Sequence, residues 1–384
     1  MISTWSFPTK IIFGAGASEQ LAELAASLNI KRPLVVTDPG IVKCGLLEQV
    51  IESFSTSGIP WKLFDRVEPN PTEASVLPGV EVFAGENCDG VVGVGGGSAL
   101  DAAKAIRLKT THRLPLEEYD DLRDGSKRIG PNLPPMIAVA TTSGTGSDVG
   151  RSAVIALKAT GRKTVIFSPY LIPSVALADP SLTLGLPPNV TAATGMDAMT
   201  HNLEAYLAVG FHPICDAIAL KGVEACARFL PRAVADGRDL EARTQMMAAA
   251  IMGGVAFQKG LGTVHSLAHP LSTVAGMHHG LTNAILLPHV MRFNLPAVPE
   301  RLADLSAALG VHTGGLPADA AERAIRAIEK LNAEIGIPAR LRDAGVREEM
   351  IPIMVPLAMQ DGCRLLNPRP TSMQDMEALY RAAL

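Results

Sequence analysis

Histidine and aspartate residues cluster in two short segments of the C-terminal half. Asp197 and His201 are four residues apart, and His265 and His279 bound a second segment of fifteen residues. On a helix, side chains four residues apart lie on one face, so Asp197 and His201 could share one ion. Imidazole with carboxylate and no thiolate suits iron(II), zinc, manganese or cobalt. If the ion accepts five or six ligands, these four leave a coordination position for a substrate oxygen. The spacing therefore predicts a Lewis-acid metal site.

Each of these histidines also has an ordinary structural interpretation. A single histidine on an apolar helix is usually buried and hydrogen-bonded, or placed at a helix C-terminus. Five of the nine histidines fall in the two segments, however, and this concentration favours the metal interpretation. His269 and His278 are additional to the four residues that such a metal site requires. We expect one of them to orient a ligand or carry a proton, and the other to be structural.

A glycine-rich turn at residues 95–98 stands between a strand-like run and a helical pattern. Glycines let the backbone approach a pyrophosphate, and free N–H groups at the start of a helix favour an anion. The turn matches the dinucleotide fingerprint loosely, with Ser98 where a third small residue is expected. The pattern therefore predicts a phosphate site, and a tight turn without a ligand is the alternative.

Two further segments offer contacts to a dinucleotide. Asp38 ends an earlier strand-like run, where a carboxylate could accept hydrogen bonds from the adenosine ribose and repel a 2′-phosphate. This position predicts NAD rather than NADP, although Asp38 before Pro39 and Gly40 also suits a turn. Residues 141–147 follow another strand-like run and offer hydroxyls and amides for phosphate or nicotinamide contacts. A polar loop is the alternative for that segment.

The two halves of the chain carry different secondary-structure patterns. Short β-branched runs alternate with helical patterns in the first half, which predicts parallel strands in βαβ units and a doubly wound, Rossmann-like α/β sheet. From residue 191 onward, alanine, leucine and methionine recur at helical periods, which predicts an all-α C-terminal half. Pro180, Pro187 and Pro188 separate the patterns. We expect domains at 1–180 and 181–384. The predicted strands are 34–37, 90–94, 136–140, 164–167 and 174–178, and the predicted helices are 17–28, 73–86, 191–207, 214–229, 240–257, 318–335 and 373–383.

Composition excludes several classes of partner. A length of 384 residues fits two domains, and a hydrophobic share of 47% with 19% charged residues favours association of subunits into a homodimer or larger homo-oligomer. A net charge of −4 gives no basic footprint for nucleic acid or an anionic membrane. Five scattered cysteines, none in a C-x-x-C pair, favour a reducing compartment. With no signal peptide visible and no apolar stretch of membrane-spanning length, we expect a soluble, cytoplasmic protein.

Taken together, the chain resembles the iron-containing (group III) alcohol dehydrogenases over nearly its whole length. The motifs that carry the resemblance are Gly95-Gly96-Gly97-Ser98 with Asp101 and Lys104, Pro69-Asn70-Pro71-Thr72, Thr141-Thr142-Ser143-Gly144-Thr145-Gly146-Ser147, Gly195-Met196-Asp197-Ala198 with His201, and His265-Ser266-Leu267-Ala268-His269-Pro270 leading to His279-Gly280.

This resemblance implies a dehydroquinate synthase-like fold, with an NAD-binding N-terminal domain and a helical C-terminal domain. It also implies a bound divalent metal ion, for which iron(II) is expected in preference to zinc. It implies interconversion of a small primary alcohol and its aldehyde by hydride transfer to and from NAD. The metal is assigned to Asp197, His201, His265 and His279, and His269 becomes the motif histidine near the nicotinamide. The implied NAD contacts are Asp38, Gly97, Ser98, Thr142, Thr145 and Lys163, and Gly96, Asp101 and Thr141 stand in the same motifs as further cofactor-binding candidates.

The segment 149–154 matches a strand that borders the substrate in relatives, so Arg151 and Ser152 are candidate substrate residues. Arg151 could pair with an acidic substrate, or it could face solvent or an acidic neighbour. A reductase of a carboxylate-bearing aldehyde or oxo acid, such as a semialdehyde or maleylacetate reductase, is therefore the alternative activity. Maleylacetate reductases in general lack the full ligand set seen here. A nucleotide-binding or metal-storage protein without turnover is a third possibility, disfavoured by the intact ligands and glycine turn.

Overall fold

The computed structural model describes residues 5–7, 9–157 and 161–384, and the described chain forms two compact units. Of the described residues, one unit comprises 7, 9–142, 147–157 and 161–183, and the other comprises 5–6, 143–146 and 184–384. We call them the sheet unit and the helical unit. Among the helices of the described residues, none is both long and apolar enough to cross a membrane.

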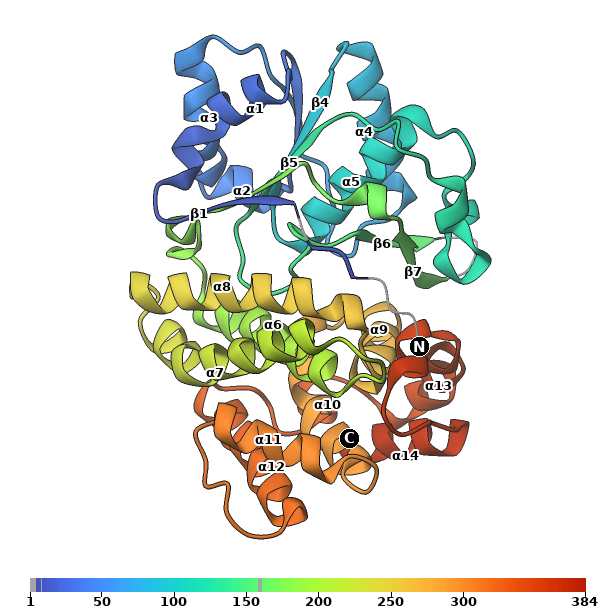
Figure 1. Ribbon diagram of the computed structural model, residues 1–384. Helices are drawn as coiled ribbons and strands as arrows, with labels where there is room; N and C mark the ends of the chain where they lie inside the picture. The colour runs from blue at the N-terminus through green and yellow to red at the C-terminus, as the bar shows by residue number, and fades with distance from the viewer. Residues whose placement is uncertain (1–4, 8, 158–160) are drawn as a thin grey trace. The chain divides into compact units, whose positions relative to one another are not determined.

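The sheet unit is built on six parallel strands in the order β1-β8-β5-β4-β2-β3 (Figure 1). The central strands are short, β-branched and buried along their whole length, as expected for a parallel sheet covered on both faces. The strands are β1 (Lys10–Phe13), β2 (Pro33–Val36), β3 (Lys62–Phe64), β4 (Gly90–Gly95), β5 (Met136–Ala140) and β8 (Val175–Ala178).

Helices cover both faces of this sheet. Successive side chains of a strand point to opposite faces, so Val35 packs with α1 and α3 whereas Leu34 and Val36 pack with α4 and α5. The helices are α1 (Leu21–Ser27), α2 (Pro39–Lys43), α3 (Leu46–Ser57), α4 (Glu73–Gly85) and α5 (Gly97–Thr111). The predicted doubly wound α/β fold is confirmed by this arrangement and, below, by the comparisons with known structures.

A separate hairpin pairs β6 (Ser152–Leu157) with β7 (Arg162–Phe167) in antiparallel fashion. The residues predicted as the strand 149–154 enter β6 only at Ser152. The reason lies in the backbone just before it, because Gly150 N–H closes a turn onto the carbonyl of Ser147 and the carbonyl of Gly150 accepts a hydrogen bond from Lys104 Nζ. Arg151 therefore precedes the strand.

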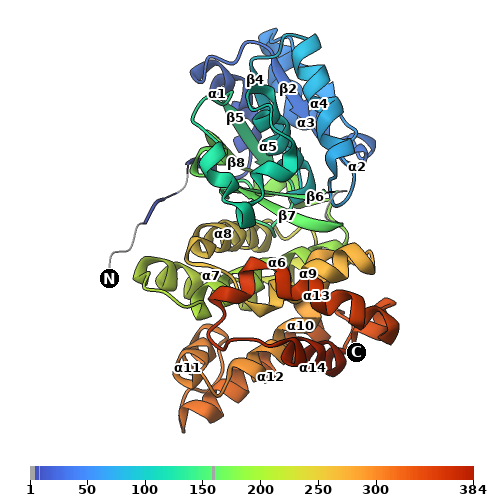
Figure 2. The ribbon, with the colours of Figure 1, turned by 90° about the vertical axis from the view of Figure 1, so that its right-hand side faces the viewer.

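The helical unit is organised around α6 (Pro188–Leu207), in which every residue from Thr191 to Leu207 is buried. It packs against α7, α8 and α10 (Figure 2). Buried polar side chains need hydrogen-bond or ionic partners. The polar side chains of α6 and their partners form the candidate site described below. The other helices of this unit are α7 (Pro213–Ala235), α8 (Leu240–Ala256), α9 (Thr263–Val274), α10 (His279–Asn294), α11 (Pro299–Ala308), α12 (Pro317–Glu334), α13 (Ile351–Gln360) and α14 (Met373–Ala383).

Candidate metal centre and cofactor residues

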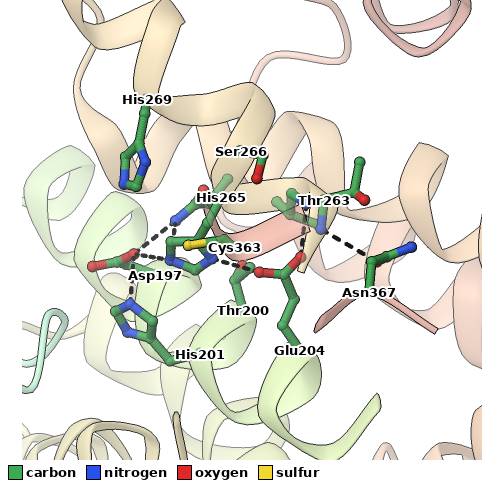
Figure 3. Close-up of polar contacts among 12 residues, drawn as sticks. Asp197, Thr200, His201, Glu204, Thr263, His265, Ser266, His269, Cys363 and Asn367 are labelled. Atoms are coloured by element: carbon green, nitrogen blue, oxygen red, sulfur yellow. Dashed lines mark hydrogen bonds and ion pairs between the residues drawn. The ribbon is translucent and has the colours of Figure 1, made fainter. Parts of the chain in front are cut away.

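Three helices of the helical unit bring the four predicted ligands together. Asp197 and His201 lie one turn apart on α6, with Asp197 Oδ1 3.8 Å from His201 Nε2. His265 of α9 and His279 of α10 place their Nε2 atoms 4.0 and 3.6 Å from the same oxygen. Figure 3 shows the rings of His201 and His265 next to the Asp197 carboxylate, and the two rings stack on each other. Asp197 and His265 are each 2% exposed, so this polar cluster lies in the protein interior.

Gly280 allows α10 to approach α6 this closely. A Cβ atom at Gly280 would lie 2.0 Å from the carbonyl oxygen of Ala193, a distance that no side chain tolerates. His279 is the first residue of α10, so the position of this helix start decides where its imidazole lies. The glycine after His279 is thus a structural requirement of the cluster. His278, the residue before α10, is exposed.

The donor set fits a divalent ion. Ligand atoms about 2.1 Å from one ion lie roughly 3–3.5 Å from each other, close to the distances that separate Asp197 Oδ1 from the three imidazole nitrogens. One carboxylate and three imidazoles suit iron(II) or zinc, and five- or six-coordinate ions would retain a position for substrate. Among the described residues, Asp197, His265 and His279 form a group that could hold a metal ion.

Asn283 of α10 also reaches into this cluster. Its Nδ2 donates a hydrogen bond to Asp197 Oδ1 at 2.8 Å and lies 3.4 and 3.3 Å from Nε2 of His265 and His279. The side chain is fully buried. The amide therefore helps to hold the carboxylate that the three imidazoles surround, and the sequence analysis did not identify this residue.

Groups behind the imidazoles fix their orientation. Nδ1 of His201 donates to the carbonyl of Gly144 at 3.3 Å, which leaves Nε2 unprotonated toward Asp197 in the neutral ring. Nδ1 of His265 lies 2.5 Å from Oε2 of Glu204, which is 4% exposed. Glu204 was missed by sequence reasoning, although it falls three residues after His201 and seven after Asp197, on the same helix face.

The two buried imidazoles differ in their electrostatic surroundings. Burial lowers the pKa of His201, and the neighbouring Asp197 only partly opposes this effect. Burial also lowers the pKa of His265, but the hydrogen bond and charge of Glu204 outweigh it, so that the net pKa is raised.

His269 lies one turn after His265 on α9, and its ring stacks on that of His279 with a centroid distance of 5.2 Å. Its Nδ1 is 2.6 Å from Oδ2 of Asp361, whose Oδ1 accepts hydrogen bonds from Ser266 Oγ and from the backbone N–H of Cys363. Asp361 was also missed, because it stands 92 residues from His269 in the chain and nothing in the local sequence links them.

Several predicted cofactor residues meet at the carboxyl ends of β2, β4 and β5 in the sheet unit. Gly95 has φ +145°, and a Cβ built there would lie 3.4 Å from Asp38 Oδ2. One built at Gly96 would lie 3.3 Å from Thr142 Oγ1, and Thr141 directly precedes this residue at the end of β5. Gly97 and Ser98 form the first turn of α5 and are partly exposed. This edge is where a parallel sheet binds dinucleotides.

Asp38 has a structural role in addition. Its Oδ1 accepts hydrogen bonds from the N–H groups of Gly40 and Ile41 at 2.8 and 3.1 Å, so it is the N-cap of α2. Both interpretations made from the sequence, the turn and the ribose contact, are therefore compatible with the geometry, because capping uses one carboxylate oxygen and leaves the other beside the glycine turn.

Asp101 and Ser152 take part in a hydrogen-bond network with the buried side chain of Lys104. Asp101 accepts hydrogen bonds from Ser147 Oγ and Val154 N–H at 2.6 and 3.1 Å. Lys104, fully buried, donates from Nζ to Ser147 Oγ and to the carbonyls of Gly150 and Ser152. Burial lowers the pKa of Lys104 to about 8, although nearby aspartates oppose this effect. This network holds the start of β6 to α5.

The remaining candidates come from other segments of the chain. Lys163 is on β7, opposite Ala156 of β6. Thr145 is in the 143–146 segment that belongs to the helical unit, whereas Thr142 belongs to the sheet unit. The guanidinium carbon of Arg151 lies 5.7 Å from the ring centroid of Phe167, a cation–π contact that positions its side chain.

Comparisons with known proteins agree with this architecture. Residues 8–180 match the family model described as iron-containing alcohol dehydrogenase, and residues 191–384 match the C-terminal model of the same family. A 4-hydroxybutyrate dehydrogenase of Cupriavidus necator is 41% identical, with 98% of each chain covered. An NAD-dependent methanol dehydrogenase of Bacillus methanolicus is 38% identical over the whole of both chains.

Among solved structures, a 1,3-propanediol oxidoreductase superposes with a TM-score of 0.96 at 42% identity, covering all of both chains. The family models together cover most of the chain, and the identity to full-length relatives exceeds 30%. This protein therefore belongs to the iron-containing alcohol dehydrogenase family.

Proposed function

We propose that this protein interconverts a small primary alcohol and its aldehyde, with NAD as the hydride carrier and a divalent ion, iron(II) before zinc, held by Asp197, His201, His265 and His279. The observation that carries the proposal is the convergence of these four side chains from α6, α9 and α10 on one buried oxygen. The family is one of metal-dependent, NAD-linked alcohol dehydrogenases, and the donor set suits the ion that its name implies.

When bound, the divalent ion supplies Lewis acidity toward the substrate oxygen, and NAD supplies the hydride acceptor. The chain's own residues do the rest. Asp197 and the three imidazoles fix the position of the ion. Asp197, His201 and His265 are buried, and the low local dielectric strengthens the electrostatic interactions among them. His269 is the proposed catalytic residue, because its Nε2 is left as an acceptor by the hydrogen bond that its Nδ1 makes to Asp361, and this atom can take the alcohol proton.

We further propose that the sheet unit holds NAD, as part of an NAD-binding domain at 1–180 followed by a catalytic domain at 181–384. The glycine turn offers backbone N–H groups at the start of α5 to the pyrophosphate. Asp38 is the proposed ribose contact. The full set of proposed cofactor-binding residues is Asp38, Gly96, Gly97, Ser98, Asp101, Thr141, Thr142, Thr145 and Lys163.

We also propose a cytoplasmic, homo-oligomeric protein, at least a dimer. All five cysteines are free thiols, which suits a reducing compartment. The apolar composition supports association, and Phe211 and Leu365, each 64% exposed, are the kind of side chain that a subunit contact would cover. Light scattering of the purified protein at several concentrations tests this proposal, since a monomer throughout would refute it.

The proposed activity is tested by absorbance assays with NADH and a panel of short aldehydes, and with NAD and the matching alcohols, at defined metal loading. We expect turnover of unbranched aldehydes such as butanal. A protein that binds NADH and metal but turns over no aldehyde of the panel would instead be a binding protein without catalysis.

A second candidate activity is reduction of an aldehyde or oxo acid that carries a carboxylate. The similarity to a 4-hydroxybutyrate dehydrogenase, whose named substrate bears a carboxylate, favours it. Arg151 and Ser152 are the proposed substrate residues for this reaction. Comparison of succinic semialdehyde with butanal separates the two activities, because a charge-recognising Arg151 should give the semialdehyde the higher kcat/KM. Equal values would exclude that role.

A further inference from the structure

Glu204 places a second buried carboxylate beside the metal-ligand cluster. It lies on α6, the helix that also carries Asp197 and His201, and its side chain points toward the start of α9. Oε2 is 2.5 Å from Nδ1 of His265, and Oε1 accepts the backbone N–H of Val264 at 2.7 Å. Figure 3 shows His265 between Asp197 and Glu204, so the imidazole is held from both sides.

This contact determines which nitrogen of His265 carries the proton. An ionised carboxylate only accepts hydrogen bonds, so Nδ1 must be the donor. In the neutral ring, Nε2 then keeps its lone pair, and Nε2 is the atom that lies 4.0 Å from Asp197 Oδ1. A metal ligand needs that lone pair.

We propose that Glu204 is the positioning residue that holds His265 in the Nδ1–H tautomer and so sets the affinity of the four-ligand site for its divalent ion. The inference rests on the proposed metal role of these ligands. It also accounts for the charge of the cluster. Asp197 and Glu204 bring two negative charges into the interior, and an unpaired buried charge is costly. A divalent ion beside three neutral imidazoles neutralises both.

A purely structural role for Glu204 must be separated from this one. Gly262 precedes α9 and offers no side-chain cap, so Oε1 of Glu204 serves as a substitute cap for the N–H of Val264. Replacement by glutamine separates the two roles, because an amide has one acceptor oxygen in place of two. If that oxygen keeps the cap, the NH₂ group faces Nδ1 of His265 and selects the Nε2–H tautomer, which blocks the ligand lone pair.

The experiment compares Glu204→Gln with the wild type by titrating metal-free protein with Zn²⁺ against a chromophoric chelator, and by recording the visible spectrum of the Co²⁺ form. We expect Zn²⁺ affinity to fall about 10- to 100-fold, with altered Co²⁺ bands. Glu224→Gln is the matched control, since Glu224 is an exposed residue of α7 paired with Lys221, and it should leave both measurements unchanged.

The outcomes distinguish this inference from the proposed function. Wild-type Zn²⁺ affinity and Co²⁺ spectrum in a folded Glu204→Gln protein would overturn the role of Glu204 while leaving the metal site intact. Failure of the wild type to bind Zn²⁺ or Co²⁺ would defeat both.

A second measurement covers the case in which Glu204→Gln does not fold. In the ¹⁵N-histidine spectrum of the Zn²⁺-loaded wild type, His265 should carry its proton on Nδ1, with its signal identified by loss in His265→Gln. An unprotonated Nδ1 would overturn the inference.

Discussion

Oδ2 of Asp361 lies 2.6 Å from Nδ1 of His269, and the two side chains come from segments 92 residues apart. The other oxygen of the carboxylate is held by Ser266 Oγ and by the N–H of Cys363, so Asp361 cannot rotate without breaking three hydrogen bonds. His269 thus has a fixed ring orientation beside His279.

The first prediction concerns turnover after Asp361→Asn. The neutral amide forms a weaker hydrogen bond with Nδ1 than the carboxylate does, so the ring of His269 is held less firmly in its orientation. We expect kcat to fall by about a hundredfold, at the low end of what proton transfer by a positioned side chain supplies. Steady-state kinetics with alcohol and NAD measure this effect. Asp343→Asn, at an exposed position, is the control, and an unchanged kcat in Asp361→Asn would remove His269 from the proton path.

The second prediction concerns acid stability. Burial raises the pKa of Asp361, but the charge of His269 and the hydrogen bonds from His269, Cys363 and Ser266 outweigh it and hold the pKa well below its usual range. A carboxyl with a lowered folded pKa contributes stability above its unfolded value, about 3.9, and loses that contribution as pH falls toward the folded value. Urea unfolding at stepped pH should therefore show a shallower loss of stability below about pH 4 in Asp361→Asn than in the wild type. Parallel curves would contradict the assignment.

The third prediction concerns cofactor choice. Asp38→Asn keeps the cap on Gly40 and Ile41, because asparagine is as good an N-cap as aspartate, but removes the charge that repels a 2′-phosphate. We expect the ratio of kcat/KM for NADP to that for NAD to rise by at least about tenfold, with little change in stability. Glu48→Gln, which removes an exposed carboxylate from α3, is the comparison variant. An unaltered ratio would exclude Asp38 as the discriminating residue.

The fourth prediction concerns the buried network in the sheet unit. Lys104→Met removes the donor to Ser147, Gly150 and Ser152 and leaves Asp101 without its buried cation. Loss of one partner from a buried ionic network costs about 3–5 kcal/mol of unfolding free energy. Equilibrium denaturation should show this loss, whereas Lys31→Met at an exposed position should differ from the wild type by less than about 0.5 kcal/mol.

Local pattern was sufficient for most of the fold. The runs at 34–37, 90–94 and 136–140 became β2, β4 and β5 because continuous β-branched stretches suit a sheet buried on both faces. The helical periods predicted α6, α7, α8, α12 and α14. Most of the predicted helix ends lie within one or two residues of the observed ends. The edge strand β1 was not predicted, since its four residues are only partly buried and their alternation is weak. The helices α10, α11 and α13 were not predicted, because they contain prolines or have short helical patterns.

The candidate site was predictable only where its residues share a helix turn or a motif. Asp197 and His201 have the spacing of one helix face, and the structure places His265 and His279 beside them; their role as ligands stays a prediction. Glu204, Asn283 and Asp361 could not be identified in the same way, because each is defined by what it contacts across helices. Their signal is burial of a polar side chain, which only tertiary packing reveals.

The most direct test of the central claim is the activity of the protein after exhaustive chelation, with metal content measured on the same sample. We predict that oxidation of a simple alcohol with NAD is lost in proportion to the metal removed and returns when iron(II) or zinc is added back. Full activity in protein shown to be free of metal would contradict the claim that Asp197, His201, His265 and His279 hold a catalytic ion.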